Sequence, residues 1–172
     1  LGRSALIEET SGWLGWNDEQ LNARKMELRE SLIADSETGK VTMVEWNNAW
    51  TKMTRSMDIY RTISEIEASG NNAEYHSANV TDASAISAAV AGRTVTGIVH
   101  GAGLEESKLV ADKTWSTFDL IVRVKIDGWK ALTNAAGDSL RFACAFTSVA
   151  GRFGNGGQTD YAAANSILDA EM

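Results

Sequence analysis

The sequence contains no proline, one cysteine and two histidines among its 172 residues. The lone Cys144 excludes an internal disulfide bond, which fits a reducing compartment such as the cytoplasm. These few sulfur and imidazole groups lack the spacing of zinc ligands, so no metal site is expected. No apolar run approaches the roughly 20 residues that span a bilayer. Basic residues are also scarce, 16 against 23 acidic ones, and the net charge of −7 disfavours nucleic acid. Neither a membrane nor a nucleic acid is therefore expected as a partner.

The chain has the length and composition of one globular domain, with 44% hydrophobic and 23% charged residues. Residues 5–58 hold four of the six tryptophans and read as a helical insert. Within and just beyond this insert the pattern predicts helices over 17–35 and 56–69. The tryptophans at 13, 16, 46 and 50 are interpreted as packing residues rather than a ligand cage.

From residue 73 onward, short apolar runs alternate with helical patterns. Such alternation predicts right-handed crossovers and an α/β fold with a doubly wound parallel sheet. Ligands bind such sheets beyond the carboxyl ends of the strands. The expected strands are 73–78, 96–100 and 141–146, and the expected helices are 82–90, 114–136 and 161–172.

The most informative stretch runs from Phe146 to Asn165. It places Ser148 at the end of an expected strand, and Tyr161 and Asn165 one turn apart on an expected helix. Four glycines between them predict a loop. A serine beside a tyrosine at a strand end is suited to polarise a carbonyl group and give it a proton.

Together with other motifs, this stretch resembles the ketoreductase domains of polyketide and polyunsaturated-fatty-acid synthases, a branch of the short-chain dehydrogenase/reductase superfamily. Ordinary members of the superfamily carry asparagine on the long helix and lysine four residues after the tyrosine. Synthase ketoreductases exchange the two, and this chain has Lys125 and Asn165. The other matching motifs are Leu1-Gly-Arg-Ser4, Ser77-Ala-Asn-Val-Thr-Asp82, Val99-His-Gly-Ala-Gly103 and Lys125-Ile-Asp-Gly128.

The resemblance implies a role for each matching residue. Tyr161 would donate the proton, Ser148 would bind the same oxygen, and Asn165 would hold the lysine and a bridging water. Lys125 is preferred over Lys130 as the catalytic lysine because only Lys125 lies in the family motif. Phe153 and Gln158 would flank the substrate channel. NADPH would be bound by Arg3, Ser4, Asn79, Val80, Gly101, Ala102 and Gly103.

The resemblance also implies that the family's first strand with its glycine-rich turn, and its last strands, are absent from residues 1–172. The chain is then expected to be an incomplete ketoreductase domain, with 73–172 as its catalytic portion. Asn79 stands where the family usually has aspartate.

The expected activity is the NADPH-dependent reduction of a 3-oxoacyl thioester on an acyl carrier protein, next to other synthase domains. The alternative is a non-catalytic, structural reductase-like domain. Adjacent Glu105 and Glu106 are interpreted as a solvated loop rather than a hydrolytic pair, because neighbours in sequence do not face one another.

Overall fold

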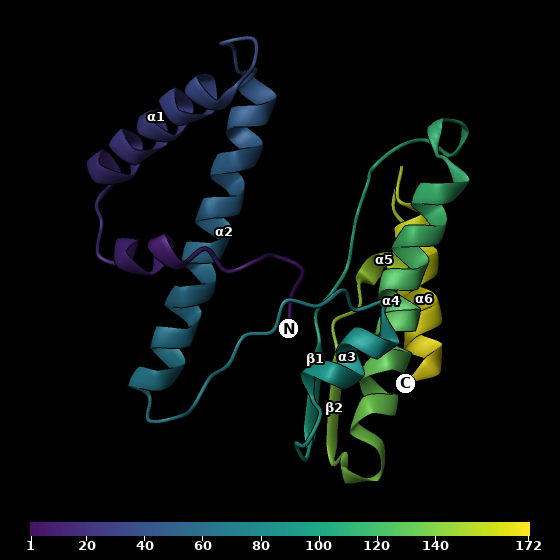
Figure 1. The fold of residues 1–172 in the computed structure, drawn as a ribbon. Coiled ribbons are helices and arrows are strands. Elements are labelled where there is room, and N and C mark those ends of the chain that lie inside the picture. The colour runs from purple at the N-terminus through teal and green to yellow at the C-terminus, as the bar shows by residue number, and fades with distance from the viewer. The chain divides into compact units, whose positions relative to one another are not determined.

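The computed structural model describes all 172 residues, which form two compact units (Figure 1). One unit comprises Gly2–Ser77, and the other comprises Ala78–Met172 together with Leu1. None of the helices has the length and apolar character needed to cross a membrane.

The first unit is helical. A 3-10 helix over Glu8–Trp13 precedes helix α1 (Asp18–Asp35) and helix α2 (Met43–Ala68). Asn17 and Thr42 each cap the following helix through a reciprocal capping box. The expected boundaries of α1 are confirmed, whereas α2 begins at Met43 rather than at 56. The apolar period that predicted α2 is clearest in its second half, so the capped first half was missed.

Stacked tryptophans form the core of the first unit. Trp13 is 4% exposed, and its ring lies 5.2 Å from that of Trp16 and 6.0 Å from that of Trp50. Met53 and Met57 of α2 are buried in the same cluster. The interpretation of the tryptophans as packing residues is therefore confirmed for these three rings.

The strand expected over 73–78 is wrong. Only a single parallel bridge joins Ser77 to Gly2, and the Gly2 amide donates to the His76 carbonyl at 3.3 Å. A strand needs a partner along several residues, and here pairing is limited to one position.

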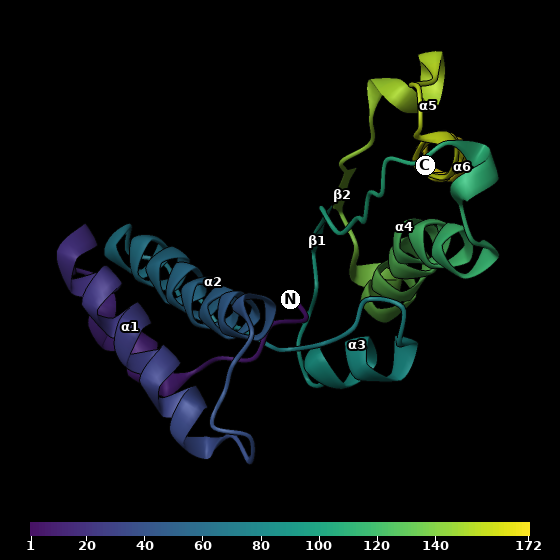
Figure 2. The same cartoon turned by 90° about the horizontal axis from the view of Figure 1, so that it is seen from above.

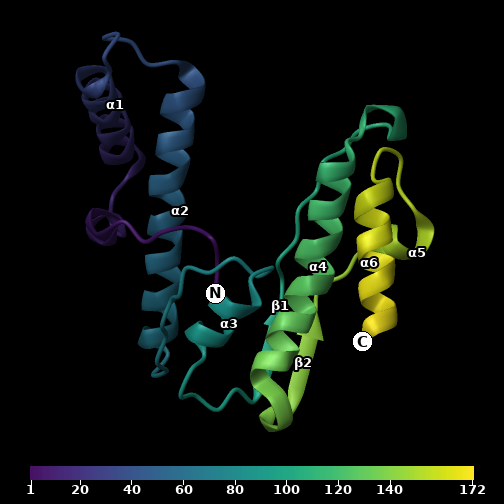
Figure 3. The ribbon, with the colours of Figure 1, turned by 45° about the vertical axis from the view of Figure 1, so that its right-hand side comes forward.

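The second unit is built on two parallel strands, β1 (Gly97–His100) and β2 (Phe142–Ala145). Their register pairs Ile98 with Ala143 and His100 with Ala145. Helix α4 (Trp115–Ala136) makes the crossover between them, and helix α6 (Thr159–Glu171) packs beside α4 (Figures 2 and 3). Helix α3 (Ala83–Ala89), capped by Asp82, also packs on α4. The expected strand–helix–strand order after residue 82 is confirmed.

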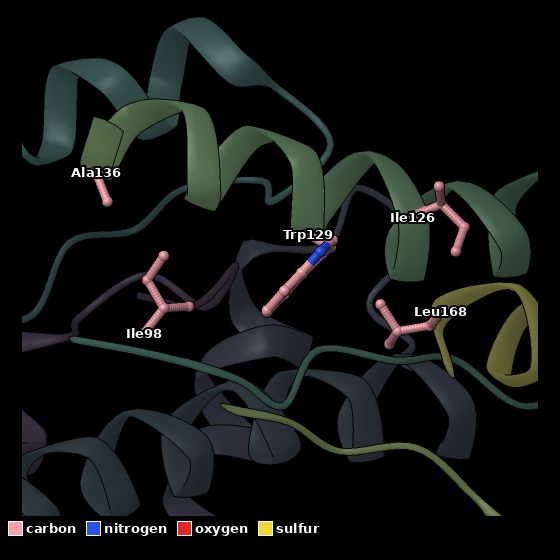
Figure 4. Close-up of a cluster of buried hydrophobic side chains, with 5 residues drawn as sticks. All are labelled: Ile98, Ile126, Trp129, Ala136 and Leu168. Atoms are coloured by element: carbon pink, nitrogen blue, oxygen red, sulfur yellow. The ribbon is translucent and has the colours of Figure 1, made fainter. Parts of the chain in front are cut away.

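The core of this unit lies between β1, α4 and α6. Its buried members come from all three elements, and Figure 4 shows Trp129 of α4 between Ile98 and Leu168. One face of α4 is almost wholly apolar, which explains why it packs onto the sheet. The cluster consists of Ile98, Ile126, Trp129, Ala136 and Leu168.

The glycine-containing stretch between Ser148 and Tyr161 was expected to be a loop, but Val149–Phe153 form the short helix α5. The Ser148 hydroxyl caps this helix by accepting the Ala150 amide at 3.2 Å. Gly151 lets α5 approach α6, because a Cβ there would lie 2.9 Å from the Ser166 backbone nitrogen. The glycine that predicted a loop thus permits a close contact between two helices.

Candidate active site

A cavity of about 260 Å³ opens at the carboxyl ends of β1 and β2. This is the edge at which parallel α/β sheets bind ligands. Residues from both strand ends, α4 and α6 surround it. The lining residues are Gly101, Gly103, Leu104, Glu105, Lys125, Phe146, Thr147 and Tyr161.

Lys125 connects the two strand ends. Its ammonium group donates a hydrogen bond of 2.6 Å to the Phe146 carbonyl, just after β2. After β1, Gly103 leaves room for the lysine, because a Cβ at that position would lie 3.1 Å from the Lys125 Cε. The residue is only 4% exposed, and this burial lowers the pKa of the ammonium below its ordinary value. Lys130, by contrast, is exposed and pairs with Glu171 at 3.3 Å, as expected for a surface lysine.

The glycine of the Lys125-Ile-Asp-Gly128 motif has a packing role. A Cβ at Gly128 would lie 2.8 Å from Val80 Cγ2 and 3.0 Å from His100 Cε1. Helix α4 therefore approaches the end of β1 more closely than any other residue at 128 would allow. His100, 1% exposed, contacts the same helix through Nε2, which lies 3.0 Å from the Lys125 carbonyl oxygen. The main chain of Lys125 is thereby fixed next to the cavity.

Tyr161 lies in the first turn of α6 and lines the cavity together with residues of the strand ends. One turn later, the fully buried Asn165 donates through Nδ2 to the Tyr161 carbonyl at 2.7 Å. The Asn165 Oδ1 atom is buried without a hydrogen-bond partner. Buried polar atoms are nearly always paired, so this oxygen has unused capacity to accept a hydrogen bond.

The remaining expected site residues of this unit have distinct positions. Ser148 follows the cavity-lining Thr147, and its hydroxyl oxygen accepts the α5 capping bond. Gln158 donates through Nε2 to Glu105 Oε1 at 3.1 Å, which connects the loop before α6 to the loop after β1. Phe153 is 79% exposed at the end of α5.

The residues expected to bind the cofactor fall in both units. Gly101 and Gly103 line the cavity, with Ala102 between them in sequence. The half-buried Val80 lies against Gly128 of α4. Asn79 accepts the Thr81 amide at 3.3 Å. Arg3 and Ser4 belong to the first unit, where their carbonyls accept hydrogen bonds from Ser77 and Tyr75.

Three features of the site were not predicted. Glu105 is exposed, as a solvated loop requires, but it also lines the cavity. Thr147 lines it too, although only its neighbour Ser148 was singled out. A buried ion pair joins Lys113 to Asp160, directly before Tyr161. The sequence shows each of these residues but not the contacts between loops that bring them together.

Solved structures share this arrangement of strands and helices. A ketoreductase domain from the bacillaene assembly line matches 69% of this chain with a TM-score of 0.58 and 32% identity, and the match covers 28% of that domain. A short-chain dehydrogenase from Burkholderia cenocepacia J2315, solved in complex with NADP, shares the fold at a TM-score of 0.60 and 22% identity, over 68% of this chain and 51% of that one. The small parallel sheet and its helices thus form an incomplete part of the Rossmann-like fold of the short-chain dehydrogenase/reductase superfamily.

The family within that superfamily is defined by sequence. Residues 37–172 match the model of the KR domain, where KR denotes ketoreductase, and the chain belongs to this family. It is 32% identical to a polyunsaturated fatty acid synthase of Thraustochytrium sp. across 98% of its own length. It is 36% identical to the erythronolide synthase EryA2 of Saccharopolyspora erythraea across 62%. It spans only 6% and 3% of the lengths of these two relatives.

Proposed function

We propose that this chain carries the catalytic residues of an NADPH-dependent reductase that converts a 3-oxoacyl thioester on an acyl carrier protein into the 3-hydroxyacyl thioester. The observation that carries the proposal is that Lys125 and Tyr161 line one cavity at the carboxyl ends of two parallel strands. The relatives support the substrate class, because they are named as a polyunsaturated fatty acid synthase and an erythronolide synthase. The free, half-buried thiol of Cys144 is compatible with a cytoplasmic setting.

In this mechanism Tyr161 is the general acid. Its phenol gives a proton to the ketone oxygen as negative charge develops there. The Lys125 ammonium, in the wall of the same cavity, would offset the negative charge that develops at the site during the reaction. Ser148 donates its hydroxyl hydrogen to the same ketone oxygen. This hydrogen is available because, in the capping bond to the Ala150 amide, the Ser148 hydroxyl oxygen acts only as an acceptor. The unpaired Asn165 Oδ1 accepts a hydrogen bond from a water molecule that connects it to Lys125.

The site also fits the expected cofactor. Gly101 and Gly103 line the cavity with exposed backbone, which a bound nucleotide could contact directly. NADPH, when bound, supplies the hydride that reduces the ketone carbon. Asn79, Val80 and Ala102 would hold the remainder of the nucleotide near the ends of the strands, and the Arg3 guanidinium would pair with the 2′-phosphate, with Ser4 adding a hydrogen bond.

The catalytic proposal is tested with Tyr161→Phe in the full-length protein. Turnover of a 3-oxoacyl thioester should fall by about 10²–10⁴-fold, the usual effect of losing a general acid. The dissociation constant for NADPH, measured by its fluorescence, should change less than about twofold. Turnover near that of the wild type would remove Tyr161 from the mechanism and favour a structural, non-catalytic domain.

The choice of cofactor is tested with Arg3→Ala. The Michaelis constant for NADPH should rise at least about tenfold, since the 2′-phosphate loses a charged partner. The constant for NADH should stay within about twofold because NADH has no phosphate at that position. Equal losses with both cofactors would assign Arg3 a structural role.

A further inference from the structure

The ion pair between Lys113 and Asp160 lies inside the second unit next to the candidate active site. The Lys113 Nζ atom is 2.8 Å from Asp160 Oδ1 and 2.9 Å from Oδ2. The two side chains are 6% and 0% exposed, whereas those of the nearby pair Lys108–Glu106 are 46% and 40% exposed. This bidentate contact is thus isolated from solvent.

The pair is connected directly to the main chain of Tyr161. Asp160 Oδ1 also accepts the Tyr161 amide at 2.8 Å, at the amino-terminal end of α6 where a carboxylate is favoured. Lys113 makes a further bond, donating to the Glu106 carbonyl at 2.7 Å. A chain of three hydrogen bonds therefore connects the loop after β1 to the backbone of the expected proton donor.

The loop after β1 and the segment before α6 are joined by two more hydrogen bonds. The Lys108 amide donates to the Gly157 carbonyl at 3.0 Å, and Gln158 binds Glu105 through its side chain. Leu104 and Glu105 at the start of this loop line the cavity. The buried ion pair thus holds one wall of the cavity against the turn that leads to Tyr161.

Stability alone is a weak reason for such a pair. Burying two charges carries a desolvation penalty that their attraction seldom exceeds, and apolar replacements of both partners are often as stable. A bidentate contact does fix direction and distance, and general acid catalysis is sensitive to displacements of about 1 Å. Building on the function proposed above, we propose that Lys113 and Asp160 are positioning residues that hold Tyr161 and the 104–108 loop in the geometry for proton transfer.

The test uses the full-length protein with Lys113→Met, Asp160→Asn and the double variant. Each single variant leaves one buried charge without its partner and should lower both kcat and thermal stability. The double variant removes both charges, so its unfolding midpoint should return to within a few degrees of the wild type. Its kcat should nevertheless stay about 10- to 100-fold low, with the NADPH dissociation constant changed less than about twofold.

Two further variants sharpen the result. Lys113→Arg keeps a charged donor that can pair with a carboxylate through two hydrogen bonds, so it should recover most of the lost kcat. Lys130→Met, which removes an exposed surface ammonium outside the cavity, should leave kcat unchanged. A stable double variant with wild-type kcat would overturn the inference, as would a Lys113→Arg variant no better than Lys113→Met.

The result also separates this inference from the proposed function. If Tyr161→Phe abolishes turnover while the double variant is fully active, only the positioning role fails. If Tyr161→Phe retains turnover, the catalytic proposal itself fails.

Discussion

His100 and Lys125 are basic side chains that the fold buries almost completely, at 1% and 4% exposure. For each, removal from water is the main cause that lowers its pKa, because a buried site disfavours the charged form. The two residues are also linked, since the His100 ring lies within hydrogen-bond distance of the Lys125 carbonyl. A neutral imidazole that donates from Nε2 suits this contact, and the nearby ammonium further disfavours a second positive charge.

This burial predicts a dependence of stability on pH. Below the ordinary histidine value of 6.5, the unfolded chain takes up a proton at residue 100 while the folded chain stays neutral. The free energy of unfolding should therefore fall as pH drops through 6.5, by at most about 1.4 kcal/mol per pH unit, and level off below the folded pKa. Denaturant unfolding of an intact ketoreductase domain between about pH 5 and pH 8 measures this change. The extrapolated free energy of unfolding is precise to about 1 kcal/mol.

The control is His100→Gln, whose amide can still donate to the Lys125 carbonyl but does not titrate. Its curve should lack the part of the acid-side decline that belongs to residue 100. Identical pH dependence in the two proteins would contradict the prediction.

At the scale of elements, the contact of α4 with the end of β1 depends on Gly128. Gly128→Ala would place a methyl group 2.8 Å from Val80 and 3.0 Å from His100. Overpacking of this kind costs about 1–3 kcal/mol, and contacts as short as 2.8 Å place this site toward the upper part of that range, above the gain of roughly 1 kcal/mol that alanine brings to a helix. We expect a net loss of stability in the intact domain and a lower kcat, because Lys125 lies on the same helix.

A matched control exists in the first unit. Gly12 lies in the 3-10 helix, and no atom lies within 4 Å of the point that a Cβ would occupy, so Gly12→Ala should be nearly neutral. Thermal unfolding of both variants decides the matter. A Gly128→Ala variant as stable and as active as the wild type would show that α4 can shift without consequence.

The elements that were predicted correctly are those whose signals are local. Helices α1, α3 and α4 begin within a residue of the expected positions, and the apolar runs before Gly101 and Phe146 form strands. The failures have non-local causes. Helix α5 forms at a glycine that packs against α6, and the segment before Ala78 forms no strand because only one residue finds a partner. The same division applies to the site, where the motif residues were predicted but the Lys113–Asp160 pair, 47 positions apart, was not.

At the scale of the molecule, the sheet of the second unit has two unlike faces. Ile98 and His100 point toward the helices and are buried, while Val99, Phe142 and Phe146 are 62%, 58% and 61% exposed. Since side chains alternate along a strand, these three lie together on the opposite face. Contiguous apolar surface of this kind is unfavourable in water and normally lies at an interface.

We therefore expect residues 1–172, expressed alone, to show no cooperative thermal transition and no NADPH binding in the micromolar range. Two four-residue strands with one uncovered apolar face give little of the burial on which a stable domain depends. Thermal unfolding and NADPH fluorescence measure the two outcomes. A sharp transition together with micromolar binding would refute the expectation.

The bridge between Gly2 and Ser77 has a consequence for how this architecture diversifies. The Gly2 amide donates to His76, and the Tyr75 hydroxyl donates to the Ser4 carbonyl at 2.7 Å, so the helical unit starts and ends at one point. A segment whose ends meet can be lengthened, exchanged or deleted while the chain on either side keeps its path. We therefore expect the helical unit to vary in length and sequence among related proteins, while its first and last residues stay paired as they are here.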